Sequence, residues 1–198
     1  MTPAAPTISP SACPPAEPTT DTDLLPHAAA GCPEAFTALF NRHYANIHAF
    51  AYRLCLCAAE AEDIAQETFI QAARSLGTFR REASFKNWLY TIATNRARDR
   101  LRQRQRRSRL DAALQAESPP DTAPPSPTAS PHQHEDIRIA LAALPLDHRE
   151  AINLVYYENL SHAEAARILG CAESTVSWRL FRAKSKLRKT LRAHHHHD

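Results

Sequence analysis

Two stretches of the chain concentrate cationic side chains, and they give the first indication of its chemistry. Residues 96–109 contain eight arginines and one acidic residue, and residues 173–192 contain seven basic residues and one acidic residue. Together they hold 15 of the 24 lysines and arginines, although the formal net charge of the chain is only +3. Two dense cationic segments are typical of a protein that binds a polyanion, most often a nucleic acid.

The residues that lead into the first cationic segment are suited to unpaired bases. Trp88, Thr91 and Asn95 share a ridge at helical spacing, which Arg98 and Arg102 continue. Any base can stack on an aromatic ring while arginine holds the phosphate backbone. The polar segment 79–84 could form a loop that pockets a flipped base. Trp88 alone fits a buried core position equally well, but a core does not explain the arginines.

The second cationic segment has the pattern of a helix-turn-helix motif. Ser161-x-x-Glu164 predicts a capped helix, Gly170 a short break, and a long basic helix follows. Asp147-x-x-Glu150 predicts a second capping box one helix earlier. The second helix of such a motif lies in the major groove of duplex DNA. A basic helix that merely faces solvent is the alternative, and the coincidence of cap, turn and cations favours DNA binding.

An acidic cluster lies near the start of another predicted helix. Glu60, Glu62, Asp63 and Glu67 would repel DNA, so we expect them to face water or a basic protein surface.

Other chemistries receive little support. The five cysteines do not form a disulfide framework, and Cys55 and Cys57 lie about 200° apart around a helix, poorly placed to share a metal. No nucleophile–base set is visible. We therefore expect no enzyme, no metal site and no cofactor, with a Cys/His metal or redox sensor as an added alternative. No apolar run is long enough to span a membrane and no targeting signal is visible, so we expect a cytoplasmic protein without membrane insertion.

The positions of proline divide the chain. Eight of its 15 prolines lie in residues 1–33 and six in 119–131, with none in 34–118 or 146–198. Because proline is poorly tolerated inside helices, we predict an all-α fold of two small helical domains, at 34–108 and 135–192. A disordered tail (1–33), a flexible Pro-rich linker (109–134) and a His-rich tail (193–198) complete the prediction. We expect the linker to hold the two domains apart.

In these segments the chain resembles the sigma-70 family of bacterial sigma factors, in its extracytoplasmic-function (ECF) branch. The stretch 61–69 is similar to region 2.2 of that family, and 79–95 with Asp99 and Arg102 is similar to regions 2.3 and 2.4. The stretches 144–151, 159–171 and 175–187 are similar to region 4. The resemblance implies a region 2 helical bundle and a region 4 helix-turn-helix.

The resemblance also implies partners and roles. It implies binding of core RNA polymerase, promoter-specific transcription initiation and an anti-sigma partner. The residues implied to bind core polymerase are Asp63, Gln66 and Glu67. Those that capture and melt the −10 element are Arg80, Arg81, Glu82, Ser84, Trp88, Thr91, Asn95, Arg98 and Arg102. Those that read the −35 element are Ser174, Thr175, Ser177, Trp178, Arg179, Arg182 and Lys186.

One alternative from another class stays open. An autonomous helix-turn-helix regulator could bind duplex operators as a dimer. Aromatic side chains suited to unpaired bases argue against it, because they serve no purpose in a reader of duplex DNA.

Overall fold

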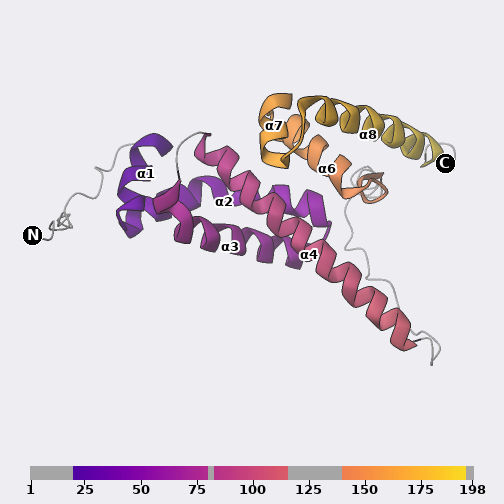
Figure 1. Ribbon diagram of the computed structural model, residues 1–198, viewed down its shortest axis with the longest axis horizontal. Helices are drawn as coiled ribbons and strands as arrows, with labels where there is room; N and C mark the ends of the chain where they lie inside the picture. Colours follow the sequence, from indigo (N-terminus) through magenta and orange to yellow (C-terminus); the bar gives the residue numbers. More distant parts are fainter. Residues whose placement is uncertain (1–19, 80–82, 116–139, 195–198) are drawn as a thin grey trace, which may run out of the picture.

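The computed structural model describes residues 20–79, 83–115 and 140–194 of the 198-residue chain (Figure 1). Every regular element in these ranges is helical, which confirms the predicted all-α class. The N-terminal domain contains α1 (Asp21–Ala29), α2 (Pro33–Cys55), α3 (Ala58–Ser75), the 3-10 turn η1 (Leu76–Thr78) and α4 (Phe85–Gln115). The C-terminal domain contains α6 (Leu146–Ile152), the π-helical turn η2 (Asn153–Tyr157), α7 (His162–Leu169) and α8 (Glu173–His194).

The core of the N-terminal domain lies between α2, α3 and the first half of α4. Apolar residues recur every three or four positions along each helix, so each presents one buried stripe. Phe50 of α2, Ile64 of α3 and Leu89 of α4 are fully buried in it. This packing fixes the relative positions of the acidic residues on α3 and the polar residues on α4.

The predicted disordered tail over 1–33 is wrong for residues 21–29, which form α1. Thr20 and Asp23 make a capping box, and Leu24 and Leu25 are buried beside α2. Burial of two leucines stabilises a helix that composition alone assigns to disorder. Residues 1–19 lie outside the described ranges.

Helix α4 is longer than we predicted. Ser84 caps it as expected, because its hydroxyl accepts a hydrogen bond from the backbone NH of Asn87 at 3.1 Å. The helix does not fray after Arg96 but continues to Gln115, so residues 109–115 of the predicted linker are helical. Side chains 102–110 are all exposed, and the helix projects beyond the domain (Figure 1).

The C-terminal domain confirms the helix-turn-helix. Ser161 and Glu164 cap each other at the start of α7, and Gly170 ends that helix in the left-handed conformation, with φ at 67°. The capping box predicted at Asp147 is wrong, because Pro145 occupies the N-cap position of α6. Glu150 is instead 1% exposed and points toward the other domain. Helix α8 includes the first two residues of the predicted His-rich tail.

The two domains contact each other, which differs from the separation that we expected of a flexible linker. Helix α7 lies against α4, and α6 and η2 lie against α2 (Figure 1). Linker residues 116–134 lie outside the part of the chain that the structure describes. The domains are joined by ion pairs and hydrogen bonds between residues far apart in sequence. The composition of the linker gives no information about these pairs.

Candidate nucleic-acid interface

The start of α4 carries an aromatic cluster. The ring of Trp88 lies 4.8 Å from that of Phe79 and 5.8 Å from that of Phe85, between centroids. Trp88 is half-buried, so these contacts hold the indole without sealing it from solvent. Ser84 flanks the cluster on the exposed side of the helix start. Arg80, Arg81 and Glu82, which we expected to complete a base-capturing loop here, fall outside the described residues.

The remaining residues predicted to contact the −10 element differ in their availability. Asn95 is exposed, and the Arg102 side chain is 69% exposed with an ion pair to Asp99 at 3.5 Å. The Thr91 hydroxyl donates to the carbonyl of Asn87 within its own helix, at 3.0 Å.

Arg98 is engaged by the other domain. Its Nε and Nη2 atoms donate to the two carboxylate oxygens of Glu150, each at 2.7 Å. This bidentate hydrogen bonding raises the pKa of the Arg98 guanidinium.

The acidic residues on α3 are already partly neutralised within the chain. Arg100 of α4 contacts Asp63 at 3.3 Å and also contacts Glu67. The hydrogen bond to Glu67 raises the pKa of Arg100. The side chains of Asp63 and Glu67 remain 52% and 39% exposed, so both are still accessible. Gln66 donates to Glu62 at 3.2 Å on the same helix.

A hollow of about 650 Å³ lies between α3 and α4, beside Glu67. Its lining is mainly cationic, and Ile70 in it is 51% exposed. The arginines that line it are Arg74, Arg96, Arg100, Arg102 and Arg106. The acidic surface of α3 therefore borders a groove lined by arginines. The spacing of residues in the sequence did not predict that this groove lies beside the acidic residues.

Most of the predicted −35 residues are available on α8. Thr175 is half-buried, and Trp178 is 54% exposed beside Arg182, whose guanidinium carbon lies 5.9 Å from its ring centroid. Arg179 is the exception, because its side chain is 18% exposed and pairs with Asp147 of α6 at 3.3 Å. It therefore holds α8 against α6. The exposed members of the set are Ser174, Ser177, Trp178, Arg182 and Lys186.

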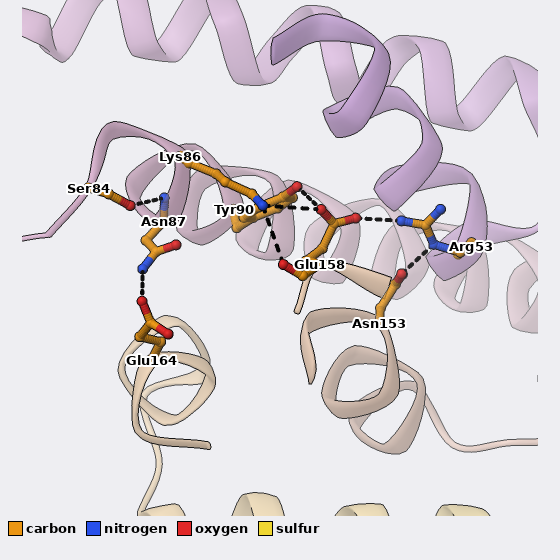
Figure 2. Close-up of polar contacts among 8 residues, drawn as sticks. All are labelled: Arg53, Ser84, Lys86, Asn87, Tyr90, Asn153, Glu158 and Glu164. Carbon is orange, nitrogen blue, oxygen red and sulfur yellow. Dashed lines mark hydrogen bonds and ion pairs between the residues drawn. The ribbon is translucent and has the colours of Figure 1, made fainter. Parts of the chain in front are cut away.

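The polar residues that sequence analysis had no reason to single out lie where the domains meet (Figure 2). Glu158 is the central residue of this contact and receives donors from both α2 and α4. Burial and the hydrogen bond to Glu158 raise the pKa of Tyr90. The partners of Glu158 are 68 and 105 positions away in the sequence, so no local pattern could have identified it.

The two cysteines considered for metal or redox chemistry, Cys55 and Cys57, differ in their exposure to solvent. Cys55 is buried, and its Sγ donates to the carbonyl of Cys57 at 3.2 Å. Burial raises the pKa of the Cys55 thiol to about 11. In the described ranges no group of three or more His, Cys, Asp and Glu side chains could hold a metal ion.

Comparison with known proteins gives this arrangement a family. The model of sigma-70 region 2 matches residues 39–107, and that of sigma-70 region 4 matches residues 134–187. Together these matches cover more than half of the chain, in the order that the two domains have here. The chain belongs to the sigma-70 family.

Relatives place this sigma factor in the ECF branch. It is 34% identical to the ECF RNA polymerase sigma factor SigM of Mycobacterium tuberculosis over 172 residues, covering 86% of this chain and 84% of the relative. It is 37% identical to the probable RNA polymerase sigma factor RfaY of Xanthomonas campestris pv. campestris over 174 residues. That match covers 84% of this chain but 43% of RfaY, so the chain spans less than half of that longer relative.

A solved structure supports the same assignment. The sigma factor RpoE of Bartonella quintana, determined in complex with the anti-sigma factor NepR, superposes with a TM-score of 0.64 at 28% identity. The match covers 79% of this chain and 96% of that one. This ECF sigma factor is thus a transcription initiation factor built from regions 2 and 4. None of its described helices is both long and apolar enough to cross a membrane.

Proposed function

We propose that this sigma factor divides promoter recognition among three surfaces of named residues. Asp63, Gln66 and Glu67 of α3 bind core RNA polymerase. The start of α4 and the loop before it capture the unpaired −10 strand. The exposed face of α8 reads the −35 duplex.

The exposure of α8 carries this proposal. Helices α6 and α7 lie between α8 and the N-terminal domain, so the outer face of α8 points to solvent (Figure 1). Serine and arginine side chains on that face match the hydrogen-bonding groups of base edges and phosphates. Trp178 adds an apolar surface suited to thymine methyl groups.

The aromatic cluster supports the second surface. Phe79 and Phe85 hold Trp88 in place, so its exposed part is a pre-oriented platform for a base. Asn95 and Arg102 extend from it along exposed α4 toward the arginine-rich projection. A single strand stacked at the cluster would find cations for its phosphates in that direction.

The partners follow from the division of surfaces. The acidic residues on α3 suit a basic surface of core polymerase, and an anti-sigma factor would compete for these surfaces. We expect the protein to act where polymerase and DNA are, in the cytoplasm, and to perform no catalytic step itself. Each DNA-reading surface alone binds weakly, and polymerase joins their binding energies through effective concentration.

The test is run-off transcription with purified core polymerase and genomic fragments, accompanied by a pull-down. Gln66→Ala combined with Glu67→Lys should abolish polymerase capture while leaving the helical content unchanged. Unaltered capture would contradict the docking assignment. A gel shift on closed duplex without polymerase examines the alternative, because tight sequence-specific binding there would favour an autonomous regulator.

A further inference from the structure

We propose that Glu158 is the centre of a latch that closes region 4 onto region 2 and competes with DNA for the same face of α4. The Glu158 latch comprises Glu150, Asn153, Glu158 and Glu164 of the C-terminal domain with Arg53, Lys86, Asn87, Tyr90 and Arg98 of the N-terminal domain. The closed state itself rests on contacts alone, and only the competition with DNA rests on the proposed function of α4.

Glu158 is held by three residues of the N-terminal domain (Figure 2). Its carboxylate accepts a hydrogen bond from Nη2 of Arg53 at 2.5 Å and another from the Tyr90 hydroxyl. Lys86 donates to its backbone carbonyl at 3.3 Å. The Glu158 side chain is 8% exposed, so the carboxylate has exchanged most of its water for these partners.

Arg53 is shared between two acceptors of the C-terminal domain. Its Nε donates to Oδ1 of Asn153, while Nδ2 of Asn153 donates to the carbonyl of Phe50 at 3.1 Å. The guanidinium also lies 4.5 Å from the centroid of the Tyr157 ring. One arginine of α2 is thus bound by three residues of the η2 turn and its end.

Arg149 adds a contact in which the C-terminal domain supplies the cation and the N-terminal domain the acceptor. Its Nη1 donates to the carbonyl of Leu54 in the last turn of α2, at 2.7 Å. Carbonyls at a helix C-terminus lack partners within the helix and attract cations. The C-terminal domain therefore contributes both acceptors, such as Glu158, and a cationic donor, Arg149, to this contact.

The residues of the latch join the domains through hydrogen bonds and ion pairs, which water can replace. Buried charges are stable only while paired, and after separation each group can be rehydrated by water. Domain interfaces of this polar kind are the ones expected to open. Gln115 ends α4 and Leu146 begins α6, so the intervening chain is long enough in sequence to span the domains when they are apart.

The latch occupies Arg98, a cation predicted to contact −10 DNA, and the neighbouring Asn87 on the same helix. Glu150 fills both donor positions of Arg98, and Glu164 accepts from Nδ2 of Asn87 at 3.1 Å. A carboxylate binds arginine with the same paired geometry as a phosphate. While these glutamates are in place, Arg98 cannot bind a DNA backbone, whereas the outer face of α8 stays exposed.

The first experiment measures closure without DNA or polymerase. Small-angle X-ray scattering of the full chain compares wild type with Glu158→Ala and with Glu173→Ala, which removes an exposed glutamate of α8 outside the latch. Wild type and Glu173→Ala should share one compact radius of gyration, and Glu158→Ala should be larger at unchanged circular dichroism. A Glu158→Ala chain as compact as wild type would overturn the latch.

A milder variant guards against misfolding. Tyr90→Phe removes one hydroxyl donor to Glu158 without changing any charge, and it should give an intermediate radius of gyration. If Glu158→Ala loses helix content, this variant alone decides: an unchanged radius would overturn the proposal.

The second experiment measures competition with DNA. A fluorescent single-stranded oligonucleotide of mixed sequence is titrated with each chain in the absence of polymerase. If the closed form makes up about 90% of the wild-type molecules, opening raises the apparent affinity about tenfold. Glu34→Ala, which makes the same change in net charge at an exposed residue of α2 outside the latch and outside both proposed DNA-reading surfaces, should bind like wild type.

The two experiments separate the possible failures. An expanded Glu158→Ala chain with unchanged DNA affinity would overturn the competition and count against the DNA-binding role of α4. Failure of polymerase-dependent transcription would contradict the proposed function and leave the scattering result intact.

Discussion

Arg100 of α4 contacts Asp63 and Glu67 of α3 at the same time, so one guanidinium serves two carboxylates on the neighbouring helix. Both carboxylates are assigned to polymerase binding, yet neither is unpaired in the free chain. A basic partner must share these acids with Arg100 or displace it. The affinity for polymerase should therefore depend on Arg100, although this cation would itself repel a basic surface.

Replacing Arg100 tests this dependence. Because the paired side chains are partly exposed, Arg100→Ala should lower the free energy of unfolding by less than ~1 kcal/mol. Freed acids should bind core polymerase up to about fivefold more tightly, the equivalent of one exposed ion pair. Fluorescence anisotropy with labelled sigma factor measures this. Arg102→Ala is the charge-matched control, and weaker binding by Arg100→Ala than by that control would contradict the interpretation.

Gly170 at the end of α7 and Gly77 within η1 should respond in opposite ways to replacement by alanine. Gly170 has a φ of 67°, where a Cβ is strained although no atom lies within 4 Å of its ideal position. Gly170→Ala should therefore destabilise region 4 by about 1 kcal/mol through backbone strain alone.

Gly77 provides the matched control for that substitution. It has equally open surroundings but no positive φ. Gly77→Ala should be neutral or stabilise by about 0.5 kcal/mol, because it restricts the unfolded chain. Urea unfolding of both variants gives the comparison, and equal losses at the two sites would refute it.

The sequence predicted those features of region 4 that are local. Ser161, Glu164 and Gly170 lie within ten residues of one another and act through backbone caps, so their spacing is sufficient. Helical spacing likewise predicted which residues share a face with Trp88 and which residues of α8 point to solvent, while their roles stay predictions. Asp147 was misassigned, because the capping pattern does not register that Pro145 is the N-cap and that the helix begins at Leu146.

Features that depend on distant partners were not predicted. Glu158 has no distinguishing neighbours in sequence, and its role arises from Arg53 and Tyr90. Helix α1 did have a signal, since Thr20-x-x-Asp23 precedes two leucines, but proline-rich surroundings favoured disorder. Arg100 was counted among DNA-binding cations because its pairing with α3 requires the tertiary fold.

The capping carboxylate of α7 predicts a pH dependence. Hydrogen bonds from the backbone NH and the hydroxyl of Ser161, and one from Asn87, hold the pKa of Glu164 below its ordinary value of 4.5. Its folded-state pKa is thus lower than its unfolded one. The stabilisation is complete above the unfolded pKa and is lost as pH falls through the folded pKa.

Glu164→Gln isolates this contribution from that of other carboxylates. Wild type should be more stable than the variant at pH 7, and the difference should shrink steadily below about pH 4.5. Urea midpoints at pH 7, 5, 4 and 3 measure it. A difference that grows in acid would reverse the sign and contradict the assignment.

The reactivity of Cys55 tests the sensor alternative. With a pKa of about 11, roughly one Cys55 thiol in a thousand is ionised at pH 8. Iodoacetamide should therefore modify half-buried Cys57 before Cys55 in the native chain, and both in denaturant. Peptide mass spectrometry resolves the two sites. Rapid native labelling of Cys55 would support a redox role that its burial opposes.

A loss of one phosphate contact should be visible in the salt dependence of −35 binding. Lys186 is exposed on α8 and suits a phosphate oxygen rather than a base edge. Lys186→Ala should weaken holoenzyme binding similarly on all promoters and lower the slope of log affinity against log salt by about 0.9. Filter binding at several salt concentrations measures the slope, and Ser185→Ala, an exposed neighbour, should leave it unchanged.

The π-helical turn η2 sets the rotational phase of Glu158 about the helix axis. The backbone NH of Glu158 donates to the carbonyl of Asn153, five residues back, at 3.1 Å. Deleting one residue from this turn would convert it to ordinary α-helix and swing Glu158 about 100° around the axis, away from Arg53. Deletion of Val155 alone would therefore separate the two domains while every residue that joins them stays in the chain.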